Sequence, residues 1–216
     1  MTSASDDARP RPRRYRGHLP EERRAERRRK LLAAGLALFT DAGYANTSVE
    51  RICSTAGVTG RHFYEEFSSR EQLLQAVYDD IVETAFALVR DQVAAAPPGL
   101  EARLDAGVAA YMHALLDDPR HARIVIVESL GVSAELDRHR RETGSAFTAF
   151  IEHEAATLLA EGVPLRGTPF TTLALVAAIH ELTVAWLAAP EPPPIDELVA
   201  EGVRIITAVA LYDPAD

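Results

Sequence analysis

The sequence has a single cysteine, Cys53, among its 216 residues, so no disulfide can form within the chain. This excludes the small secreted scaffolds that depend on disulfides and favours a reducing compartment. The N-terminal residues also lack the apolar stretch that a secretory signal carries behind its positive charges. Together these absences predict a protein of the cytoplasm.

Sequence patterns of the common catalytic sites are missing as well. The chain contains no glycine-rich phosphate loop, no G-x-S-x-G turn and no H-E-x-x-H helix. None of its seven histidines lies four residues from another, and Cys53 falls at a core position of a helical motif, so a metal site is not expected. We therefore predict a protein that is not an enzyme and that carries neither a cofactor nor a metal.

Charge is distributed unevenly along the chain. Residues 1–70 hold fourteen Lys or Arg against nine Asp or Glu, whereas residues 71–216 hold nine against twenty-three. The net charge is therefore +5 in the first part and −14 in the second, which the overall value of −9 conceals. A basic head on an acidic body is typical of a protein whose head meets a polyanion, although Arg-rich tails also serve solubility alone.

No stretch reads as a pair of strands joined by a hairpin turn, and apolar residues recur at helical spacing after residue 20. Glycine, proline and capping residues separate these runs; Thr168-Pro169, for example, is a cap followed by proline at the first helical position. The chain is predicted to be all-α. Its nine expected helices lie at about residues 21–43, 47–57, 58–63, 69–93, 100–116, 118–130, 133–161, 168–189 and 195–212.

Composition and helix pattern divide the chain into three predicted regions. Residues 1–20 are rich in Pro, Arg, Ser and Asp and are expected to be disordered in isolation. The five arginines of this arm would lie on phosphates or in a minor groove, or would form only a solvated tail. Residues 21–68 form the expected head, and residues 69–216 form a larger helical body.

The head contains the spacing of a helix-turn-helix motif. Cys53 is a small residue where two helices would cross, Gly57 can adopt a positive φ at the turn, and Phe63 would anchor the second helix. Such a second helix fits the major groove of DNA, with side chains near its N-terminus reaching base edges. Helical hairpins without a DNA role share this spacing. The outward face of the second helix would carry Thr59, Gly60, Arg61, His62 and Tyr64.

Over about 50 residues the chain resembles the N-terminal DNA-binding domain of the TetR (tetracycline-repressor-like) family. The helices after residue 95 match that family only in number and length. The resemblance implies a nine-helix fold, with a three-helix head for DNA and a body for ligand binding and dimerisation. The matching segments are LLAAGLALF, Gly43-Tyr44, Thr47-Ser48-Val49-Glu50, Ala56-Gly57-Val58, Phe63-Tyr64 with Phe67, and Ser69-Arg70-Glu71 with Leu73-Leu74.

The resemblance also implies roles for individual residues of the head. Thr47 would cap its helix and meet a phosphate, Tyr64 and Arg70 would contact the DNA backbone, and Arg61 would read guanine. Glu65 and Glu66 place two negative charges beside the expected DNA-binding surface. They would either form a solvated edge, which we favour, or sharpen specificity by repelling DNA that is bound loosely. The expected DNA-binding residues are Thr47, Ser48, Thr59, Gly60, Arg61, His62, Tyr64 and Arg70.

The segment Phe170–Ala189 is apolar on nearly every side, unlike a helix with one wet face. A membrane span has a similar length, but His180 and Glu181 in the middle and the lack of a basic flank favour burial against the body and a second copy. With the TetR resemblance, this predicts a homodimer through the last two helices and no membrane insertion. The expected dimer contacts are Leu173, Ala177, His180, Val184, Ile205 and Val209.

The resemblance further implies a pocket for a small effector between residues 70 and 190. Inward-facing positions there suggest an apolar effector, and each position can equally be ordinary core. The expected function is a homodimeric repressor that a small apolar ligand releases from a pseudo-palindromic operator; an activator or a protein-interaction module with weak DNA binding is the alternative. The expected ligand contacts are Phe86, Tyr111, Met112, Leu115, Ile126, Phe147, Phe150, His153, His180 and Trp186.

Overall fold

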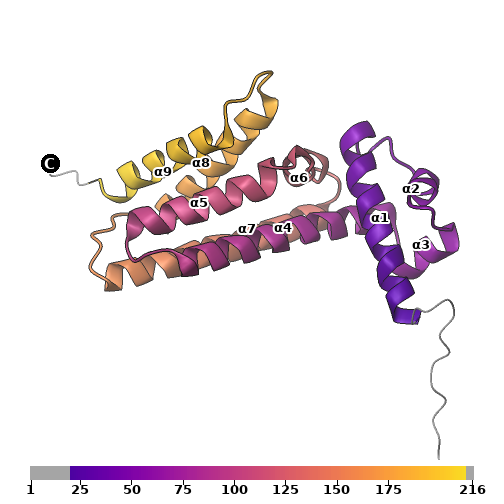
Figure 1. Ribbon diagram of the computed structural model, residues 1–216, viewed down its shortest axis with the longest axis horizontal. Helices are drawn as coiled ribbons and strands as arrows, with labels where there is room; N and C mark the ends of the chain where they lie inside the picture. Colours follow the sequence, from indigo (N-terminus) through magenta and orange to yellow (C-terminus); the bar gives the residue numbers. More distant parts are fainter. Residues whose placement is uncertain (1–19, 213–216) are drawn as a thin grey trace, which may run out of the picture.

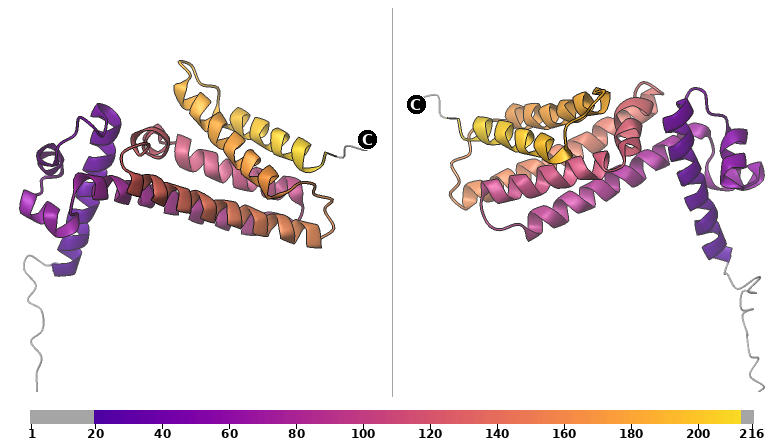
Figure 2. Two further views of the ribbon diagram at one scale, coloured as in Figure 1. Left: turned by 180° about the vertical axis from the view of Figure 1, so that it is seen from behind. Right: turned by 45° about the horizontal axis from the view of Figure 1, so that its top comes forward.

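A computed structural model describes residues 20–212, so the arginine arm predicted at 1–20 lies almost wholly outside the described residues. Within them the fold is all-α, as predicted: nine α-helices and one π-helical segment, with no strand. A small head of three helices sits at one end of an elongated helical body (Figures 1 and 2). The long helix α4 joins the two, running from the head along the body.

The head is built from α1 (Pro20–Ala42), α2 (Val49–Ala56) and α3 (Gly60–Glu66). Ser48 caps α2, because its hydroxyl accepts a hydrogen bond from the Arg51 amide. The prediction that Thr47 caps this helix is wrong. Thr47 is fully buried, and its hydroxyl donates to the carbonyl oxygens of Leu38 and Gly43, so it ties α1 to the turn before α2.

The body consists of α4 (Arg70–Ala95), α5 (Leu100–Leu116), α6 (Pro119–Arg123), α7 (Ala134–Ala160), α8 (Pro169–Ala188) and α9 (Ile195–Ala210). Figure 1 shows α4, α5 and α7 lying nearly parallel, with α8 and α9 stacked on one side of them. Ser69 caps α4 as predicted, accepting from the Gln72 amide. The helix starts and stops therefore follow local capping chemistry at most of the predicted places.

One predicted helix differs in its internal geometry. Residues 118–130 were expected to form a single α-helix, but α6 ends at Arg123 and a π-helical segment, η1 (Ile124–Glu128), continues it. The Val125 carbonyl accepts from the hydroxyl of Ser129 (3.1 Å) and from the Arg140 guanidinium (3.3 Å). These side chains add hydrogen bonds to a backbone oxygen of the π-helical segment.

The hydrophobic core runs without a break from the head into the body. One buried cluster includes Phe39 and Phe63 of the head, Leu73 of α4, and Leu115 and Ile124 of the body. Continuous burial of this kind means that the head cannot move freely on the body, since moving it would expose apolar surface. The boundary predicted at residues 68 and 69 is therefore not a gap in the packing.

A direct hydrogen bond also links head and body. Glu128, at the end of η1, is mostly buried; its Oε2 accepts from the Tyr44 backbone amide at 2.8 Å. The other oxygen accepts from Arg123 Nε at 3.2 Å. The turn between α1 and α2 is thereby fixed to η1, and the head is held at two places, through η1 and through the start of α4.

His113 gives the body a pH-dependent contact. Its Nδ1 lies 2.9 Å from Asp117 Oδ1, and its Nε2 lies 3.2 Å from Asp196 Oδ1 at the start of α9. Both ring nitrogens can donate only in the imidazolium form. The pKa of His113 is raised above its ordinary value. The main cause is the hydrogen bond to Asp117, and the hydrogen bond to Asp196 adds to it.

We expect His113→Gln to remove a stabilisation that depends on pH. Because the folded-state pKa is raised, the contribution is complete below the unfolded value of about 6.5 and is lost as the pH rises through the folded value. The Tm difference between wild type and variant should be largest near pH 5.5 and shrink toward pH 8.5. His153→Gln, on the exposed face of α7, is the control; an equal pH trend in that variant would contradict the assignment.

Candidate functional site

The recognition surface is the outward face of α3 together with its N-terminal turn. Gly57 ends α2 with φ +63°, a conformation that glycine adopts without strain. Thr59 then caps α3: its hydroxyl accepts from the His62 amide (3.4 Å) and contacts His62 Nδ1 (3.1 Å). The cap fixes the first turn of α3, where base-reading side chains of such motifs lie.

The inward face of α3 holds this surface in place. Phe63 is completely buried and Phe67 nearly so, and their ring centroids lie 5.9 Å apart. Tyr64, the next residue, is 62% exposed and packs edge-on against Phe63 at 5.3 Å. A seven-residue helix cannot persist alone in water, so α3 owes its position to this aromatic anchor.

The outward face combines one long cation with an uncrowded backbone. The Arg61 side chain is 87% exposed and pairs with Glu65 on the next turn, at 3.2 Å between Nε and Oε1. A methyl group added to Gly60 would meet nothing within 4 Å, so core packing does not require glycine there. Its absent side chain leaves room for close approach of another surface at the start of α3.

Glu66 does not lie on the recognition surface. Its side chain is 2% exposed and accepts from Arg24 Nε at 3.0 and 3.2 Å, with Arg27 Nη2 at 3.9 Å. It therefore ties α3 to α1, and the expectation of a solvated edge is wrong for this residue. Glu65, paired with Arg61, is the acid that remains at the surface.

Three other predicted DNA contacts, Arg70, Ser48 and Thr47, have partners within the head. Arg70 donates to the carbonyl oxygens of Thr47 and Ala45, and its guanidinium lies over the Tyr44 ring at 4.2 Å. Arg70 therefore braces the turn before α2, while Ser48 is exposed beside it and caps α2. The hydroxyl of Thr47 is buried and cannot reach a phosphate.

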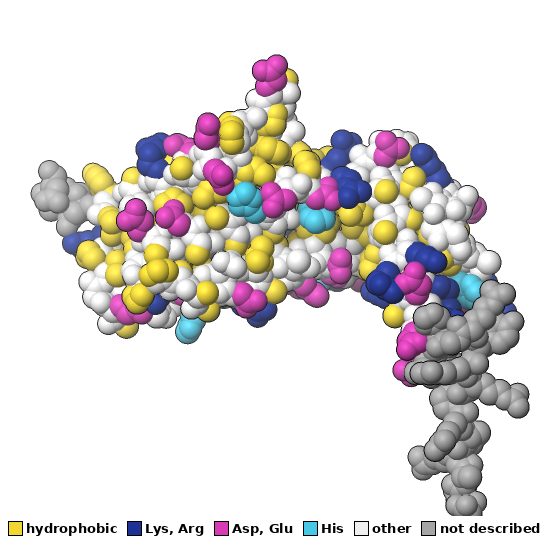
Figure 3. Space-filling model, viewed as in Figure 1, with side chains coloured by type: hydrophobic (Ala, Val, Ile, Leu, Met, Phe, Trp, Pro, Cys, Tyr) yellow, Lys and Arg dark blue, Asp and Glu magenta, His cyan; other side chains and the backbone are white. Residues whose placement is uncertain are grey.

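Sequence reasoning missed the cations of α1. Arg24 reaches α3 through Glu66, and Arg28 lies over the Phe67 ring at 4.8 Å, so these cations of α1 pack against the inward side of α3. Their signal in the sequence is the run RRAERRRK at 23–30. Figure 3 shows Lys and Arg side chains gathered around the lower part of the head.

The body contains a cavity of about 440 Å³ at its end remote from the head. It lies between the last turns of α4, the first half of α5, the end of α7, and parts of α8 and α9. This volume falls within the range of small-molecule sites, and the lining is mainly aliphatic and aromatic. The wall includes Val93, Leu104, Tyr111, Phe147, Phe150, Leu158, Leu175 and Ile206.

Three of the ten predicted ligand contacts line this cavity: Tyr111, Phe147 and Phe150. Tyr111 stacks on Phe147 with centroids 5.7 Å apart, and burial raises the pKa of its phenol to about 12. Phe86 packs edge-on behind Phe147, at 4.8 Å. These rings form one aromatic side of the cavity.

The other predicted ligand contacts lie elsewhere. Met112, Leu115 and Ile126 are buried in the core, and His153 is exposed on α7. Trp186 donates its indole N–H to the Pro193 carbonyl at 2.7 Å, which fixes the turn before α9. His180 is half-buried. Its pKa is lowered, mainly by burial and secondly by the nearby charge of Arg140. Helical periodicity alone could not distinguish these core positions from cavity positions.

The predicted dimer residues divide between the surface and the packing inside the chain. Leu173, Ala177 and Val209 are exposed, whereas His180, Val184 and Ile205 are half-buried. Only 11% of the residues at 170–188 are buried, although α8 is long and apolar enough to cross a membrane by length and composition alone. The exposed side chains of α8 follow one face of the helix: Phe170, Leu173, Ala174, Ala177, Glu181, Ala185 and Ala188.

Comparison with known proteins places the head in a family. Residues 31–77 match the sequence model of "Bacterial regulatory proteins, tetR family". The chain is 31% identical over 104 residues to the HTH-type transcriptional repressor KstR2 of Mycolicibacterium smegmatis, covering 48% of this chain and 49% of that protein. It is 32% identical over 102 residues to the transcriptional activator FasR of the same organism, covering 47% and 46%. The chain thus spans about half the length of these relatives.

Solved structures extend the likeness to the body. The fatty acid degradation regulator FadR of Bacillus halodurans superposes with a TM-score of 0.77 at 16% identity, covering 83% of this chain and 94% of that one. FadR of Bacillus subtilis, solved in complex with stearoyl-CoA, also gives 0.77, at 14% identity and 84% and 98% coverage. At these identities the likeness concerns the fold alone. Residues 31–77 thus carry the head of the tetR family of bacterial regulatory proteins, and the body shares the fold of these solved regulators.

Proposed function

We propose that this protein is a sequence-specific DNA-binding transcriptional regulator without enzymatic activity, acting in the cytoplasm as a homodimer. The observation that carries the proposal is the face of α3: Thr59, Arg61 and Tyr64 point outward from a helix that Phe63 anchors firmly beneath them. Exposed donors on a rigid helix are what reading base edges in a major groove requires. Arg61 would read a base, and Tyr64 and Ser48 would contact phosphates.

The exposed apolar face of α8 supports the homodimer. Its members are mostly alanine and larger apolar residues, with Glu181 the single charge in the series. Small side chains let two helices approach closely, and an exposed apolar stripe of this length in water favours a covering partner. A second copy with the same face provides a self-complementary interface about a two-fold axis.

Two-fold symmetry determines the form of the operator. Two copies of α3 related by a dyad would enter successive major grooves about 34–36 Å apart, or a wider multiple of the helical turn. The half-sites would then be inverted copies of one another. A pseudo-palindromic operator is the direct consequence of the proposed dimer.

The apolar cavity supports control by a small apolar ligand. It touches the last turns of α4, while the first turns of the same helix carry the head. A ligand that binds one conformer better shifts the population toward that conformer, and typical couplings are about 1–3 kcal/mol. The stearoyl-CoA held by the Bacillus subtilis FadR is a precedent within this fold for an acyl ligand. We propose that the protein represses transcription while it is bound to the operator. Ligand binding would release it.

Activation is the second reading within the same class, since the matched FasR is named an activator. Both readings use the same α3 surface and the same dimer; they differ in the operator position relative to the promoter. A protein-interaction module with only weak DNA binding is the third reading. A nuclease footprint on the DNA flanking the coding sequence, at moderate salt, separates them. A protected pseudo-palindrome supports the regulator, and its place relative to the promoter separates repression from activation.

We expect Arg61→Ala to lower specific operator affinity about 5- to 150-fold, the equivalent of 1–3 kcal/mol for one bidentate base contact. Nonspecific DNA affinity should fall far less, because phosphate contacts remain. Fluorescence anisotropy with operator and scrambled duplexes measures both. Arg138→Ala, on the exposed side of α7, is the matched control. An equal loss on both duplexes would contradict base reading by Arg61.

A further inference from the structure

The exposed face of α8 contains one charge that no cation balances. Glu181 lies near the middle of this face, with the exposed Ala177 one turn before it and the exposed Ala185 one turn after it. Within residues 20–212, no Lys or Arg side chain forms an ion pair with the Glu181 carboxylate. A second copy that covers this face would leave an unpaired carboxylate in the contact, which is costly. The proposed homodimer therefore needs a cation opposite Glu181.

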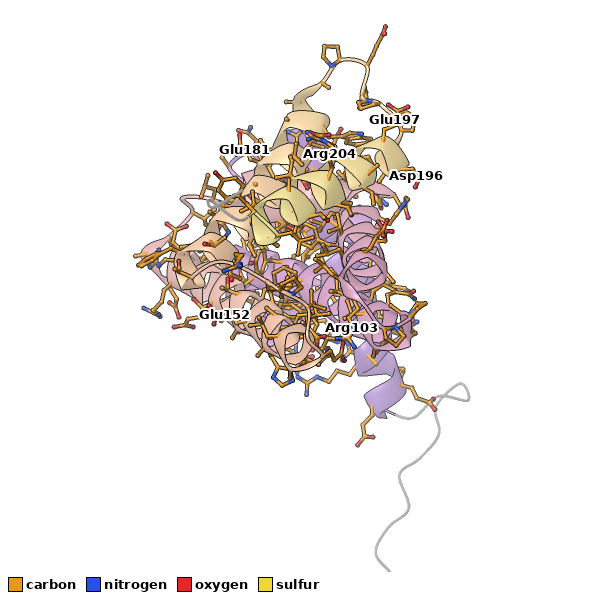
Figure 4. The ribbon with its side chains drawn as sticks, turned by 90° about the vertical axis from the view of Figure 1, so that its left-hand side faces the viewer. Arg103, Glu152, Glu181, Asp196, Glu197 and Arg204 are labelled. Atoms are coloured by element: carbon orange, nitrogen blue, oxygen red, sulfur yellow. The ribbon has the colours of Figure 1, made fainter. Side chains whose placement is uncertain are left out.

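The neighbouring helix α9 carries that cation. Arg204 is the only Lys or Arg of α8 and α9, and its side chain is 67% exposed. It also has an exposed alanine one turn away on either side, Ala200 and Ala208. Figure 4, which views the body from its cavity end, shows Glu181 on α8 and Arg204 on α9, the two helices at the upper side of the body. The two exposed faces thus share the order small, charged, small, with opposite charges.

The place of the head limits how two copies can combine. The head lies at one end of the elongated body, and α8 and α9 lie side by side along that body (Figures 1 and 2). α8 packs on α7 and α9 packs on α5, so the two helices form one outer layer. Two heads reach the same duplex only when they lie at the same end of the dimer, so the two-fold axis runs along the body. Rotation about this axis places α8 of each copy against α9 of the other.

Contacts within one chain show which residues would meet. Figure 1 shows α8 and α9 running in opposite directions. Ile179 and Gly202 lie at one level along the body, because a Cβ added to Gly202 would be 2.9 Å from Ile179 Cδ1. Arg204, two residues after Gly202, is therefore level with Ala177, two residues before Ile179. Rotation about the long axis keeps these levels, so Arg204 of the second copy would lie against Ala177.

This position brings opposite charges together. Glu181 is four residues, or about one helical turn, from Ala177. An arginine that lies over Ala177 thus has the Glu181 carboxylate one turn away, which is the spacing at which ion pairs form along a helix surface. Alanine at the crossing lets the two helix axes approach to the short end of the usual range of about 8–10 Å.

The same alignment matches the apolar side chains. Counting from Ile179 and Gly202, Leu173 is level with Ala208, and Phe170 is level with Leu211. All four of these side chains are exposed in the single chain. A large residue would therefore face a small one in the first pair, and two large apolar residues would cover each other at the cavity end of the second.

Arg204 can hold a second carboxylate in addition to the one it already contacts. Within α9 its Nε and Nη2 donate to the two carboxylate oxygens of Glu201, with 2.8 Å between Nε and Oε2. These bonds use one edge of the guanidinium and leave the Nη1 donors for another acceptor. An exposed pair of this kind on one helix contributes little by itself, so sharing the guanidinium costs little.

We propose that each Glu181 of the homodimer pairs with Arg204 of the second copy, and that these two symmetric ion pairs select the α8-against-α9 arrangement. This inference rests on the proposed function, because it names the contact that specifies the proposed homodimer. A second copy supplies the cation opposite Glu181 and the carboxylate opposite Arg204 at once, since two-fold symmetry repeats each contact. Charge complementarity of this type fixes which surfaces combine.

The test uses two charge reversals in the full chain, Glu181→Arg and Arg204→Glu. In either variant alone both symmetric contacts hold like charges, so the dissociation constant of the dimer should rise about tenfold or more. In an equal mixture of the two variants, a heterodimer has opposite charges at both contacts, so mixing should restore the dimer. Sedimentation velocity at micromolar concentration measures the assembly, and native mass spectrometry identifies which copies combine.

Arg138→Glu is the matched control, because Arg138 is also exposed and also pairs with a glutamate on its own helix, α7. This variant should remain dimeric. Recovery of the dimer in the mixture shows that both charge reversals are folded. Unchanged dimerisation of both single variants, or a mixture that stays monomeric, would overturn the ion pair while the homodimer stands. A monomeric wild-type chain would overturn the proposed homodimer and this inference together.

Discussion

Replacing Phe63 with alanine is expected to lower the free energy of unfolding by about 3–5 kcal/mol, the usual range for truncating a fully buried phenylalanine. Phe63 is 0% exposed and belongs to the cluster that continues from the head into the body. The cavity left behind would lie under a seven-residue helix that has little stability of its own. Specific DNA binding should therefore disappear with the loss of α3, even where the body remains folded.

Urea unfolding followed by circular dichroism, together with an operator-binding assay, measures both effects. Tyr64→Ala is the matched control, since it removes a neighbouring aromatic ring that is largely exposed. That variant loses the edge-on contact with Phe63, so it should lower the free energy of unfolding by about 0.5–1.5 kcal/mol, less than Phe63→Ala, while still weakening DNA binding. If Phe63→Ala unfolds at the wild-type urea concentration, the aromatic anchor is not what holds the recognition helix.

Leu173→Arg is expected to separate the proposed dimer and to lower operator affinity about 10²- to 10⁴-fold, because the two half-sites would no longer be bound by one linked molecule. Leu173 is 54% exposed on the apolar face of α8. A two-fold interface would bring the two introduced arginines into the same contact region, where like charges repel in a desolvated setting. Sedimentation velocity should show a monomer at micromolar concentration.

Leu130→Arg makes the same change at another exposed leucine, in the turn after η1, where 63% of the residue is exposed. This control should remain dimeric and bind its operator normally. Dissociation by Leu130→Arg and not by Leu173→Arg would place the interface away from α8. The circular dichroism spectrum of Leu173→Arg checks that the variant is folded. We expect it to be unchanged, because the side chain at this position already faces solvent.

Local chemistry explains why the element pattern could be predicted. The cap at Ser69, the positive-φ glycine at residue 57 and the proline after Thr168 act on neighbouring backbone, so short sequence windows contain the information. The outward face of α3 follows in the same way, since Phe63 and Phe67 determine which side is buried.

Contacts between distant segments explain what the sequence could not predict. The burial of Thr47 depends on the carbonyl of Leu38, and the burial of Glu66 depends on Arg24, 42 residues earlier. Thr47 and Ser48 are both good caps, and the hydrogen bonds of the Thr47 hydroxyl to Leu38 and Gly43 decide between them. The cavity is harder still, because apolar residues facing a cavity and apolar residues facing the core follow the same helical period.

The α4 helix has a further consequence for the DNA that the proposed dimer would bind. It contains neither glycine nor proline over its 26 residues, so it has no built-in hinge. At 1.5 Å per residue it is about 39 Å long, and a tilt of about 5° displaces one end by roughly 3.4 Å. That is about the rise of one base pair. In a symmetric dimer the two α4 helices would move their heads in opposite directions, so the two displacements add to the distance between the heads. A tilt of a few degrees would therefore change the preferred half-site spacing by about two base pairs.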